Sequence, residues 1–327
     1  MARDDACWVT RPFDPEFDIL YAREVAAAGD DPRRLRKLHA RGHLIRIRRG
    51  AYALASRWEA ADDRLRHVAR VLAAAHDAVT PFLVAGRSAA ALWDAPIFGS
   101  FGRTVEVLDT YRGGGRSEPG VGRSTSAPRH GNPVTRYGVD VTDVPRTAID
   151  LACASPFPEA VAAMDWAISS TNADSVTVGI IRDRLSEIGR RPGARMAWRA
   201  ADLAISTSGS AGESYARAVV HELGFEAPIA QFDVVDGLGS MYPDFAWPAI
   251  RVLAEFDGFA KYADPRFNHG DPVEKVRRER AREARLRALG WTIVRVGWAD
   301  VKDPARVGRL LASAGVPKRL EFVRRGM

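Results

Sequence analysis

The apolar and polar positions follow a clear pattern between residues 242 and 261. From Val252 to Asp257 they alternate, which is typical of a strand whose two faces lie in different surroundings. One face carries Val252, Ala254 and Phe256, and the other carries Leu253, Glu255 and Asp257. A tight connection at Pro248 would place Asp244, on the preceding strand, across from the Leu253 to Glu255 segment. We therefore expect three acids at one end of a sheet.

Three carboxylates in one place require a compensating charge. Two like charges about 4 Å apart repel by roughly 4 kcal/mol at an effective dielectric constant of about 20. Such a cluster therefore normally holds a metal cation, a shared proton or a basic partner. Oxygen ligands favour a divalent cation, Mg²⁺ or Mn²⁺, and its expected ligands are Asp244, Glu255 and Asp257. The alternative is that these carboxylates face solvent beside Arg251.

The acidic strand belongs to a longer pattern of elements. A helix begins near Glu213 and is followed by strands over residues 229–235, 241–246 and 251–257, a charged helix over 273–289 and a further strand. The order is helix, three strands, helix, strand. Ser210 and Glu213 have capping-box spacing, so Glu213 is explained either by helix capping, with Arg217 as an ion-pair partner, or by a place in the acidic site. On the charged helix, Lys275, Arg278 and Arg282 form a basic stripe that could face phosphates.

The first 60 residues combine helices with a basic hairpin. One helix is predicted over residues 16–28, ending at Gly29, and a second over residues 31–41, with Asp31 and Pro32 at its start. The segment HLIRIRRGAYAL follows as a short hairpin that turns at Gly50. This order is typical of a winged helix-turn-helix, whose second helix enters the major groove of double-stranded DNA. The alternative is a helical cap with a solvated charged face.

The basic residues of this region are the expected DNA contacts. Between Asp31 and Gly50 the chain has eight Lys or Arg against one Asp, an excess as large as the net charge of +7 on the whole chain. A basic block this concentrated is typical of a polyanion site or of a solvated helix face. The predicted DNA-binding residues are Arg33, Arg34, Arg36, Lys37, Arg46, Arg48, Arg49, Arg278 and Arg282.

The middle of the chain carries a mixed pattern. Helices are predicted over residues 62–78 and 88–93, and strands over 104–108 and 134–141. Arg146 and Asp150 have i,i+4 spacing, which a surface ion pair on a helix explains. Helices between residues 158 and 206 are expected to bury Trp166, Ile180, Leu185, Trp198 and Leu203. The segment STSGSAG then predicts a linker at residues 206–212.

Composition limits the class of protein. A chain of 327 residues with 46% apolar and 27% charged residues is expected to form two or three globular domains. Cys7 and Cys153 are the only cysteines and have no ligand spacing, so neither a disulfide framework nor a cysteine zinc site is indicated. The sequence has no export signal and no apolar stretch of membrane-spanning length, and we expect a cytoplasmic protein without a membrane partner.

Two resemblances extend these expectations. LRKLHARGHLIRIRRGAYAL, GRSAAALWDAP and VTDVPRTAIDLA resemble the AbiEi-type antitoxin family of type IV toxin-antitoxin systems. PDFAW, EFDGFAKY and EKVRRERAREARLRALGWTIVRV resemble the very short patch repair (Vsr) branch of the PD-(D/E)XK endonuclease superfamily. The resemblances imply an α+β multidomain protein: a winged helix-turn-helix (residues 1–60), an AbiEi-like mixed α/β middle domain (61–206) and a restriction-endonuclease-like αβββαβ domain (207–327).

The second resemblance implies catalytic roles. It carries the helix Glu of the superfamily onto Glu213, the PD aspartate onto Asp244 and the downstream acid onto Glu255. Asp257 stands where the superfamily usually has a Lys, so the positive charge would come from Lys261, Lys275 or Arg278. A bound Mg²⁺ would activate water for hydrolysis of a DNA phosphodiester bond.

The first resemblance implies another class of function. In this alternative the protein is a DNA-binding transcriptional regulator or antitoxin that keeps the nuclease fold for binding only. A cognate toxin is then a further partner. The sequence sets no oligomeric state.

Overall fold

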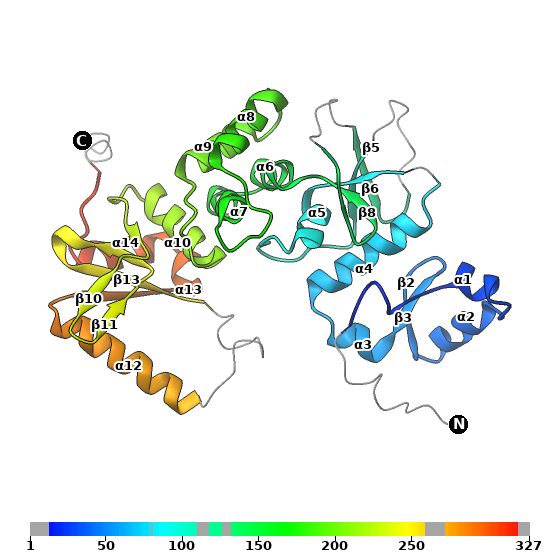
Figure 1. Ribbon diagram of the computed structural model, residues 1–327, viewed down its shortest axis with the longest axis horizontal. Coiled ribbons are helices and arrows are strands. Elements are labelled where there is room, and N and C mark those ends of the chain that lie inside the picture. The colour runs from blue at the N-terminus through cyan, green and yellow to red at the C-terminus, as the bar shows by residue number, and fades with distance from the viewer. Residues whose placement is uncertain (1–12, 80, 110–117, 126–131, 259–271, 320–327) are drawn as a thin grey trace. The chain divides into compact units, whose positions relative to one another are not determined.

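The computed structural model describes residues 13–79, 81–109, 118–125, 132–258 and 272–319 (Figure 1). Its contacts divide the chain into two compact units. Unit 1 runs through Leu151 and includes Ile180–Pro192, whereas unit 2 comprises Ala152–Gly179 and the chain from Gly193 onward. None of the helices in the described ranges combines the length and apolarity needed to cross a membrane.

The first part of unit 1 is a small sheet with helices packed on it. Its elements are β1 (Ile19–Tyr21), α1 (Ala22–Ala27), α2 (Arg33–Ala40), β2 (Leu44–Arg48), β3 (Ala51–Leu54) and α3 (Ala55–Ala60). The strand order is β1-β3-β2, with both pairs antiparallel. Leu35 of α2 packs against Leu44 and Tyr52 of the hairpin. Gly50, at a φ of 82°, makes the turn that a residue with a side chain would adopt only with strain.

One predicted helix begins later than expected. The helix predicted over residues 16–28 starts only at Ala22, because Ile19–Tyr21 form a strand that pairs with Ala51–Ala53. Ile19 is buried, so the non-local pairing outweighs the helical composition of the segment.

The second part of unit 1 is a five-stranded mixed sheet in the order β6-β5-β4-β8-β7. Its elements are α4 (Asp63–His76), β4 (Leu83–Val84), α5 (Gly86–Trp93), β5 (Val105–Asp109), β6 (Val121–Thr125), β7 (Val134–Arg136), β8 (Val139–Val141), α6 (Val144–Ala154) and α8 (Val178–Ile188). Arg146 and Asp150 form the expected i,i+4 pair at 2.9 Å, but the expectation that it lies on the surface is wrong. Both side chains are buried, and Asp150 also accepts from Arg191 at 2.6 Å.

Unit 2 begins with helices. These are α7 (Phe157–Ile168), α9 (Ala194–Leu203) and α10 (Ala211–Glu222). Among the residues expected in the helical core, Leu185 of α8, in unit 1, is buried, whereas Ile180 is 44% exposed and its neighbour Ile181 takes the buried position. Trp166, Trp198 and Leu203 are half-buried.

The rest of unit 2 is a four-stranded sheet covered on both faces. Its elements are β9 (Ile229–Ala230), β10 (Val234–Asp236), β11 (Gly239–Met241), β12 (Phe245–Trp247), the 3₁₀ turn η1 (Pro248–Ile250), β13 (Val252–Asp257), α12 (Pro272–Ala288), β14 (Thr292–Gly297), α13 (Trp298–Val301) and α14 (Pro304–Ser313). The strand order is β14-β13-β12-β9, with β13 and β14 parallel and the other pairs antiparallel.

The two faces of β13 have the predicted composition. Val252, Ala254 and Phe256 lie in one core with residues of α10 and α14. Leu253 lies in a second core with Leu286 of α12 and residues of the separate β10–β11 hairpin. The alternation predicted from the sequence is therefore confirmed.

Two of the predicted strands are interrupted. The segment 229–235 breaks after β9, where Gln231 has a φ of 50°. The segment 241–246 breaks between β11 and β12. As a result, β10 and β11 leave the main sheet and, among the strands in the described ranges, pair only with each other.

Candidate functional site

The basic residues of α2 lie on an exposed helix face. Only Leu35 of this helix is buried, whereas Arg33, Arg34, Arg36 and Lys37 are all exposed. The backbone N–H of Arg33 donates to Asp31 at 2.9 Å, which satisfies one donor at the helix start. The charged face that the sequence predicted is thus available to a polyanion.

The hairpin arginines lie in the same small fold as α2. His39 of α2 is hydrogen-bonded through its Nδ1 to the carbonyl oxygen of Leu44, at 2.9 Å, and so ties the helix to β2. Arg46 and Arg49 are exposed. Arg48 is half-buried and forms ion pairs with Asp77 at 3.7 Å and Glu118 at 3.3 Å. Arg48 is therefore already partly neutralised within the protein.

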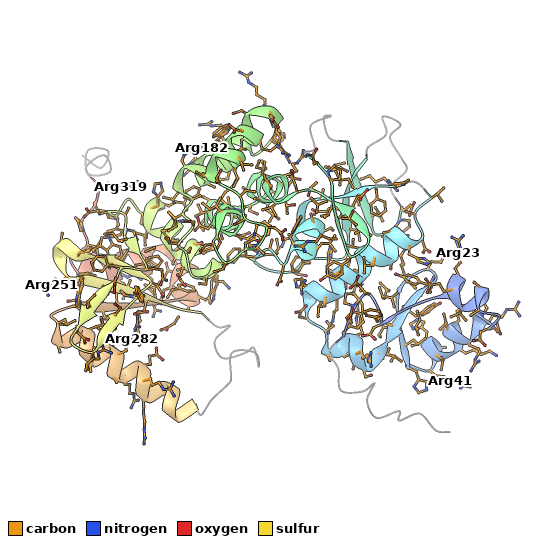
Figure 2. The ribbon with its side chains drawn as sticks, in the orientation of Figure 1. Arg23, Arg41, Arg182, Arg251, Arg282 and Arg319 are labelled. Atoms are coloured by element: carbon orange, nitrogen blue, oxygen red, sulfur yellow. The ribbon has the colours of Figure 1, made fainter. Side chains whose placement is uncertain are left out.

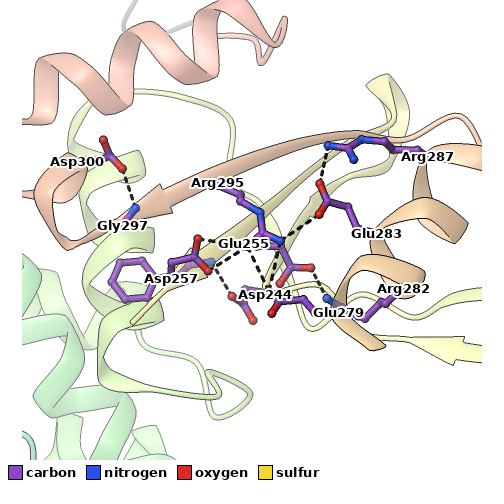
Figure 3. A network of polar contacts seen from close by, with 11 residues as sticks. Asp244, Glu255, Asp257, Glu279, Arg282, Glu283, Arg287, Arg295, Gly297 and Asp300 are labelled. Carbon is purple, nitrogen blue, oxygen red and sulfur yellow. Dashed lines mark hydrogen bonds and ion pairs between the residues drawn. The ribbon is translucent and has the colours of Figure 1, made fainter. Parts of the chain in front are cut away.

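The predicted acidic site lies at one end of the sheet in unit 2. Phe245 of β12 pairs with Ala254 of β13, so Asp244 lies beside the end of β13, as predicted. One oxygen of Asp244 accepts from the backbone N–H of Phe256 at 2.7 Å. Figure 3 shows Asp244, Glu255 and Asp257 gathered at this end.

Glu213 is buried in the first turn of α10. Its carboxylate accepts from the backbone N–H of Gly209 at 2.9 Å, the hydroxyl of Ser210 at 2.9 Å and the side-chain amide of Gln231 at 3.1 Å. The N–H of Glu213 donates to the hydroxyl of Ser210, so the capping role is confirmed. Burial raises the pKa of Glu213, and the charge of Asp244 raises it further. Glu213 is therefore within electrostatic reach of Asp244.

Arg217 has a different partner from the one expected. It does not pair with Glu213 but donates to Asp165 of α7 at 2.6 Å and to the carbonyl of Leu203 at 2.6 Å. Arg217 and Asp165 are both buried. The pair thus connects helices far apart in the sequence, which i,i+4 spacing alone could not show.

Glu255 is paired with the basic stripe of α12. Arg282 donates to Glu255 at 2.8 Å and to the carbonyl of Tyr242 at 2.9 Å. The guanidinium of Arg285 donates hydrogen bonds to the carboxylate of Asp236, one of them at 2.7 Å from its Nε. These hydrogen bonds lower the pKa of Asp236 to about 2. Asp244, Glu255, Arg282 and Arg285 line a cavity of about 460 Å³. Sequence reasoning missed Arg285 and Asp236, which are 49 residues apart.

Asp257 faces a basic side chain from the neighbouring strand. Arg295 of β14 lies opposite Glu255 in the strand register. Its guanidinium contacts Asp257 at 3.2 Å, Glu279 at 3.3 Å and Glu283 at 3.2 Å (Figure 3). Sequence reasoning also missed Arg295, because only the parallel pairing of β13 and β14 brings it to the acids.

The residues in place fit a metal ion only in part. Asp244 and Glu255 are hard oxygen donors, which suit Mg²⁺ or Mn²⁺. Within the described ranges, however, no three His, Cys, Asp or Glu residues are grouped so that they could hold a metal. Lys261 and the side chain of Lys275 lie outside the described residues. Arg278 is exposed on α12.

Comparisons with known proteins point first to the N-terminal region. Residues 17–55 match the family model described as "Transcriptional regulator, AbiEi antitoxin". These residues span β1 to β3 and include α2 and the basic hairpin. Residues 17–55 are thus similar to a domain of transcriptional regulators of the antitoxin type.

The names of two similar proteins and of one similar solved structure give no function. The chain is 31% identical over 168 residues to two proteins of Mycobacterium tuberculosis, uncharacterized protein MT2308 of strain CDC 1551 / Oshkosh and uncharacterized protein Rv2248 of strain ATCC 25618 / H37Rv. The match covers 51% of this chain and 58% of each relative. The crystal structure of RV2827C protein from Mycobacterium tuberculosis matches with 17% identity and a TM-score of 0.35, over 61% of this chain and 75% of that one.

Proposed function

We propose that this protein is a DNA-binding transcriptional regulator of the antitoxin type, which contacts double-stranded DNA through the winged helix of unit 1. The observation that carries this proposal is the exposed basic face of α2 within the residues that match the antitoxin family model. A cognate toxin is the second partner that this family implies.

The geometry of α2 and the hairpin supports contact with a duplex. In a winged helix-turn-helix the recognition helix lies in the major groove while the hairpin reaches the backbone or the minor groove. Arg33 and Arg36 of α2 are exposed, and Arg49 stands at the exposed hairpin turn. Each Lys or Arg that neutralises a phosphate releases counterions, so the affinity for DNA falls steeply as salt rises.

A salt titration tests the proposal. Binding of the intact protein to a duplex from its own promoter region is measured by fluorescence anisotropy between about 50 and 200 mM salt. The double variant Arg33→Ala/Arg36→Ala should bind DNA more weakly. Its plot of log K against log salt should also be less steep, by about 0.9 for each lost phosphate contact. Arg309→Ala on α14, whose side chain is 70% exposed, is the matched control and should change neither quantity. Equal slopes for the double variant and the wild type would contradict the proposal.

The acidic site supports a second candidate function, Mg²⁺-dependent hydrolysis of DNA. The specific observation is the position of Asp244 at the end of β13, with Glu213 within electrostatic reach. A bound metal would supply a water of lowered pKa, and this chain's own part would be to hold the metal through Asp244 and Glu255. Lys261 and Lys275 are the candidates for orienting the phosphate.

Calorimetry and a nicking assay separate this candidate from the first. Asp244→Ala and Glu255→Ala should abolish Mg²⁺ binding and Mg²⁺-dependent nicking of supercoiled plasmid, while DNA binding persists. Asp303→Ala, which removes a half-exposed carboxylate elsewhere in unit 2, is the control. Nicking that continues in both site variants would reject the nuclease.

A further inference from the structure

A cavity of about 330 Å³ lies within unit 1, between the hairpin and the five-stranded sheet. Its basic lining comes from three separate segments: Arg46 and Arg48 of β2, Arg70 of α4, and Arg103 just before β5. Its apolar lining includes Ile45 and Val105. The cavity therefore combines concentrated positive charge with an apolar wall, and its volume is within the range of about 300–1,000 Å³ that small-molecule sites occupy.

The positive charge of this cavity is only partly balanced. Arg48 is paired with Asp77 and Glu118. Arg46 donates to the carbonyl of Arg48 at 3.3 Å, a contact that neutralises no charge. Arg103 is exposed and makes no hydrogen bond or ion pair with any residue in the described ranges.

Arg70 is fixed in place without a direct carboxylate contact among the described residues. Its guanidinium lies 5.4 Å from the centre of the Trp58 ring and donates to the carbonyl of Gly102 at 3.3 Å. Burial lowers the pKa of Arg70, and the positive charge of Arg103 lowers it further, while Asp63 acts in the opposite direction. Two positive charges that line one cavity repel each other, and an anion bound between them stabilises both.

We propose that this cavity binds a small organic anion, with a phosphate group on Arg70 and Arg103 and an apolar or planar body against Ile45 and Val105. Guanidinium groups suit this role because their planar donors can bind two oxygens of one phosphate. In this proposal the phosphate group belongs to a free small molecule. The DNA backbone could also supply a phosphate group, and the experiment below distinguishes the two sources.

Such a ligand would touch both the hairpin and the second sheet of unit 1. Since β2 carries arginines of the proposed DNA surface, a ligand in the cavity would change the affinity of the protein for DNA. Coupling between two binding sites is reciprocal, so bound DNA would change the affinity for the ligand by the same factor. This regulatory consequence rests on the proposed DNA-binding function, whereas the binding site itself does not.

Isothermal titration calorimetry of the intact protein tests the site without DNA. Adenosine 5′-monophosphate is the organic anion and inorganic phosphate is the minimal one. We expect the nucleotide to bind at one site and more tightly than inorganic phosphate. Arg103→Ala should weaken nucleotide binding by roughly tenfold, the effect of losing one charged hydrogen bond. Arg23→Ala removes an exposed arginine of α1 in the same unit (Figure 2) and should leave binding unchanged.

Three outcomes would overturn the site. These are absence of nucleotide binding at millimolar concentration, an affinity that Arg103→Ala does not change, and equal affinity for the nucleotide and inorganic phosphate. Duplex DNA is titrated into the same variants as a separate arm. If Arg103→Ala weakens DNA binding but not nucleotide binding, the cavity belongs to the DNA surface and the proposal fails. If Arg33→Ala/Arg36→Ala loses DNA binding but binds the nucleotide normally, the DNA surface and the cavity are separate sites, as proposed.

Discussion

Glu213 is a buried carboxyl group whose charged form is disfavoured by its surroundings. Burial and the nearby charge of Asp244 both raise its pKa above the ordinary value of 4.5, although three hydrogen bonds oppose them. The folded state therefore binds a proton more tightly here than the unfolded state does. It follows that this group's contribution to stability is complete below about pH 4.5 and is lost as the pH rises through the folded pKa.

The variant Glu213→Gln should remove this pH dependence. The unfolding free energy of the wild type, minus that of the variant, should fall with a slope of at most about 1.4 kcal/mol per pH unit above pH 4.5 and then level off. Urea unfolding between pH 4 and 8 measures it. In the Asp244→Asn background the fall should end at a lower pH, because the neighbouring charge is gone. A difference that stays constant across this range would contradict the assignment.

The Asp165–Arg217 pair makes a second prediction at the scale of residues. Both side chains are buried, and burial raises the pKa of Asp165 even though Arg217 opposes it. Arg217→Met should cost about 3–5 kcal/mol of stability, because a buried carboxylate loses its partner. Asp165→Asn/Arg217→Met should recover part of that loss, since no unpaired charge remains. Chemical unfolding of the wild type and the two variants measures both effects, and an Arg217→Met variant as stable as the wild type would refute the argument.

These ion pairs show which part of the candidate site the sequence could supply. The alternation of apolar and polar residues along β13 was enough to predict that Glu255 and Asp257 share one face of the strand. The predicted chain reversal at Pro248 then placed Asp244 beside that face. The basic partner Arg295 required the parallel register of β13 and β14, which no local pattern contains. The same limit applies to Arg146 and Asp150, whose spacing predicted the pair but whose burial depends on the packing around it.

At the scale of elements, the start of α10 is fixed by its contact with the central strand. A Cβ atom at Gly212 would lie 2.2 Å from Cε1 of the buried Phe256 ring and 3.0 Å from its Cζ. Gly212→Ala should therefore destabilise unit 2 by about 1–3 kcal/mol, the usual cost of overpacking. Thermal unfolding followed by circular dichroism measures this change.

A second glycine provides the matched control. Gly308 is also helical, in α14, but its added Cβ would meet only the methyl groups of Leu223 at 4.0 Å. Gly308→Ala should be neutral or stabilising by up to about 1 kcal/mol, because alanine favours the helix. If Gly212→Ala behaves like Gly308→Ala, close packing of α10 on β13 is not what positions Glu213.

Element boundaries were predictable where local chemistry sets them and not where pairing does. Ser210 caps α10 and Asp62 caps α4, and both helices begin as their sequences predicted. Ile19–Tyr21 form a strand only because β3 is available as a partner. The one-residue shift of the buried position from Ile180 to Ile181 likewise depends on how α8 is rotated against its neighbours.

At the scale of the whole molecule, the chain leaves one unit and returns to it. Unit 1 contains Ile180–Pro192, and unit 2 contains Ala152–Gly179. The Ser- and Gly-rich stretch predicts a boundary at residues 206–207, yet helices on both sides of it belong to unit 2. The backbone N–H of Ile205 donates to Asp165 at 2.8 Å, and Arg217 reaches back to the carbonyl of Leu203.

Two fragments test where the folding unit begins. Fragment 207–327 contains Arg217 but lacks Asp165 and Leu203, so it must bury a guanidinium without its acceptors or expose it. Fragment 152–327 keeps both partners and should have the higher melting temperature. Arg217→Met should then destabilise fragment 152–327 but not fragment 207–327, because the shorter fragment has already lost the pair. Equal melting temperatures for the two fragments, with equal effects of the substitution, would place the functional boundary at the linker and leave α7 and α9 outside the domain that carries the acidic site.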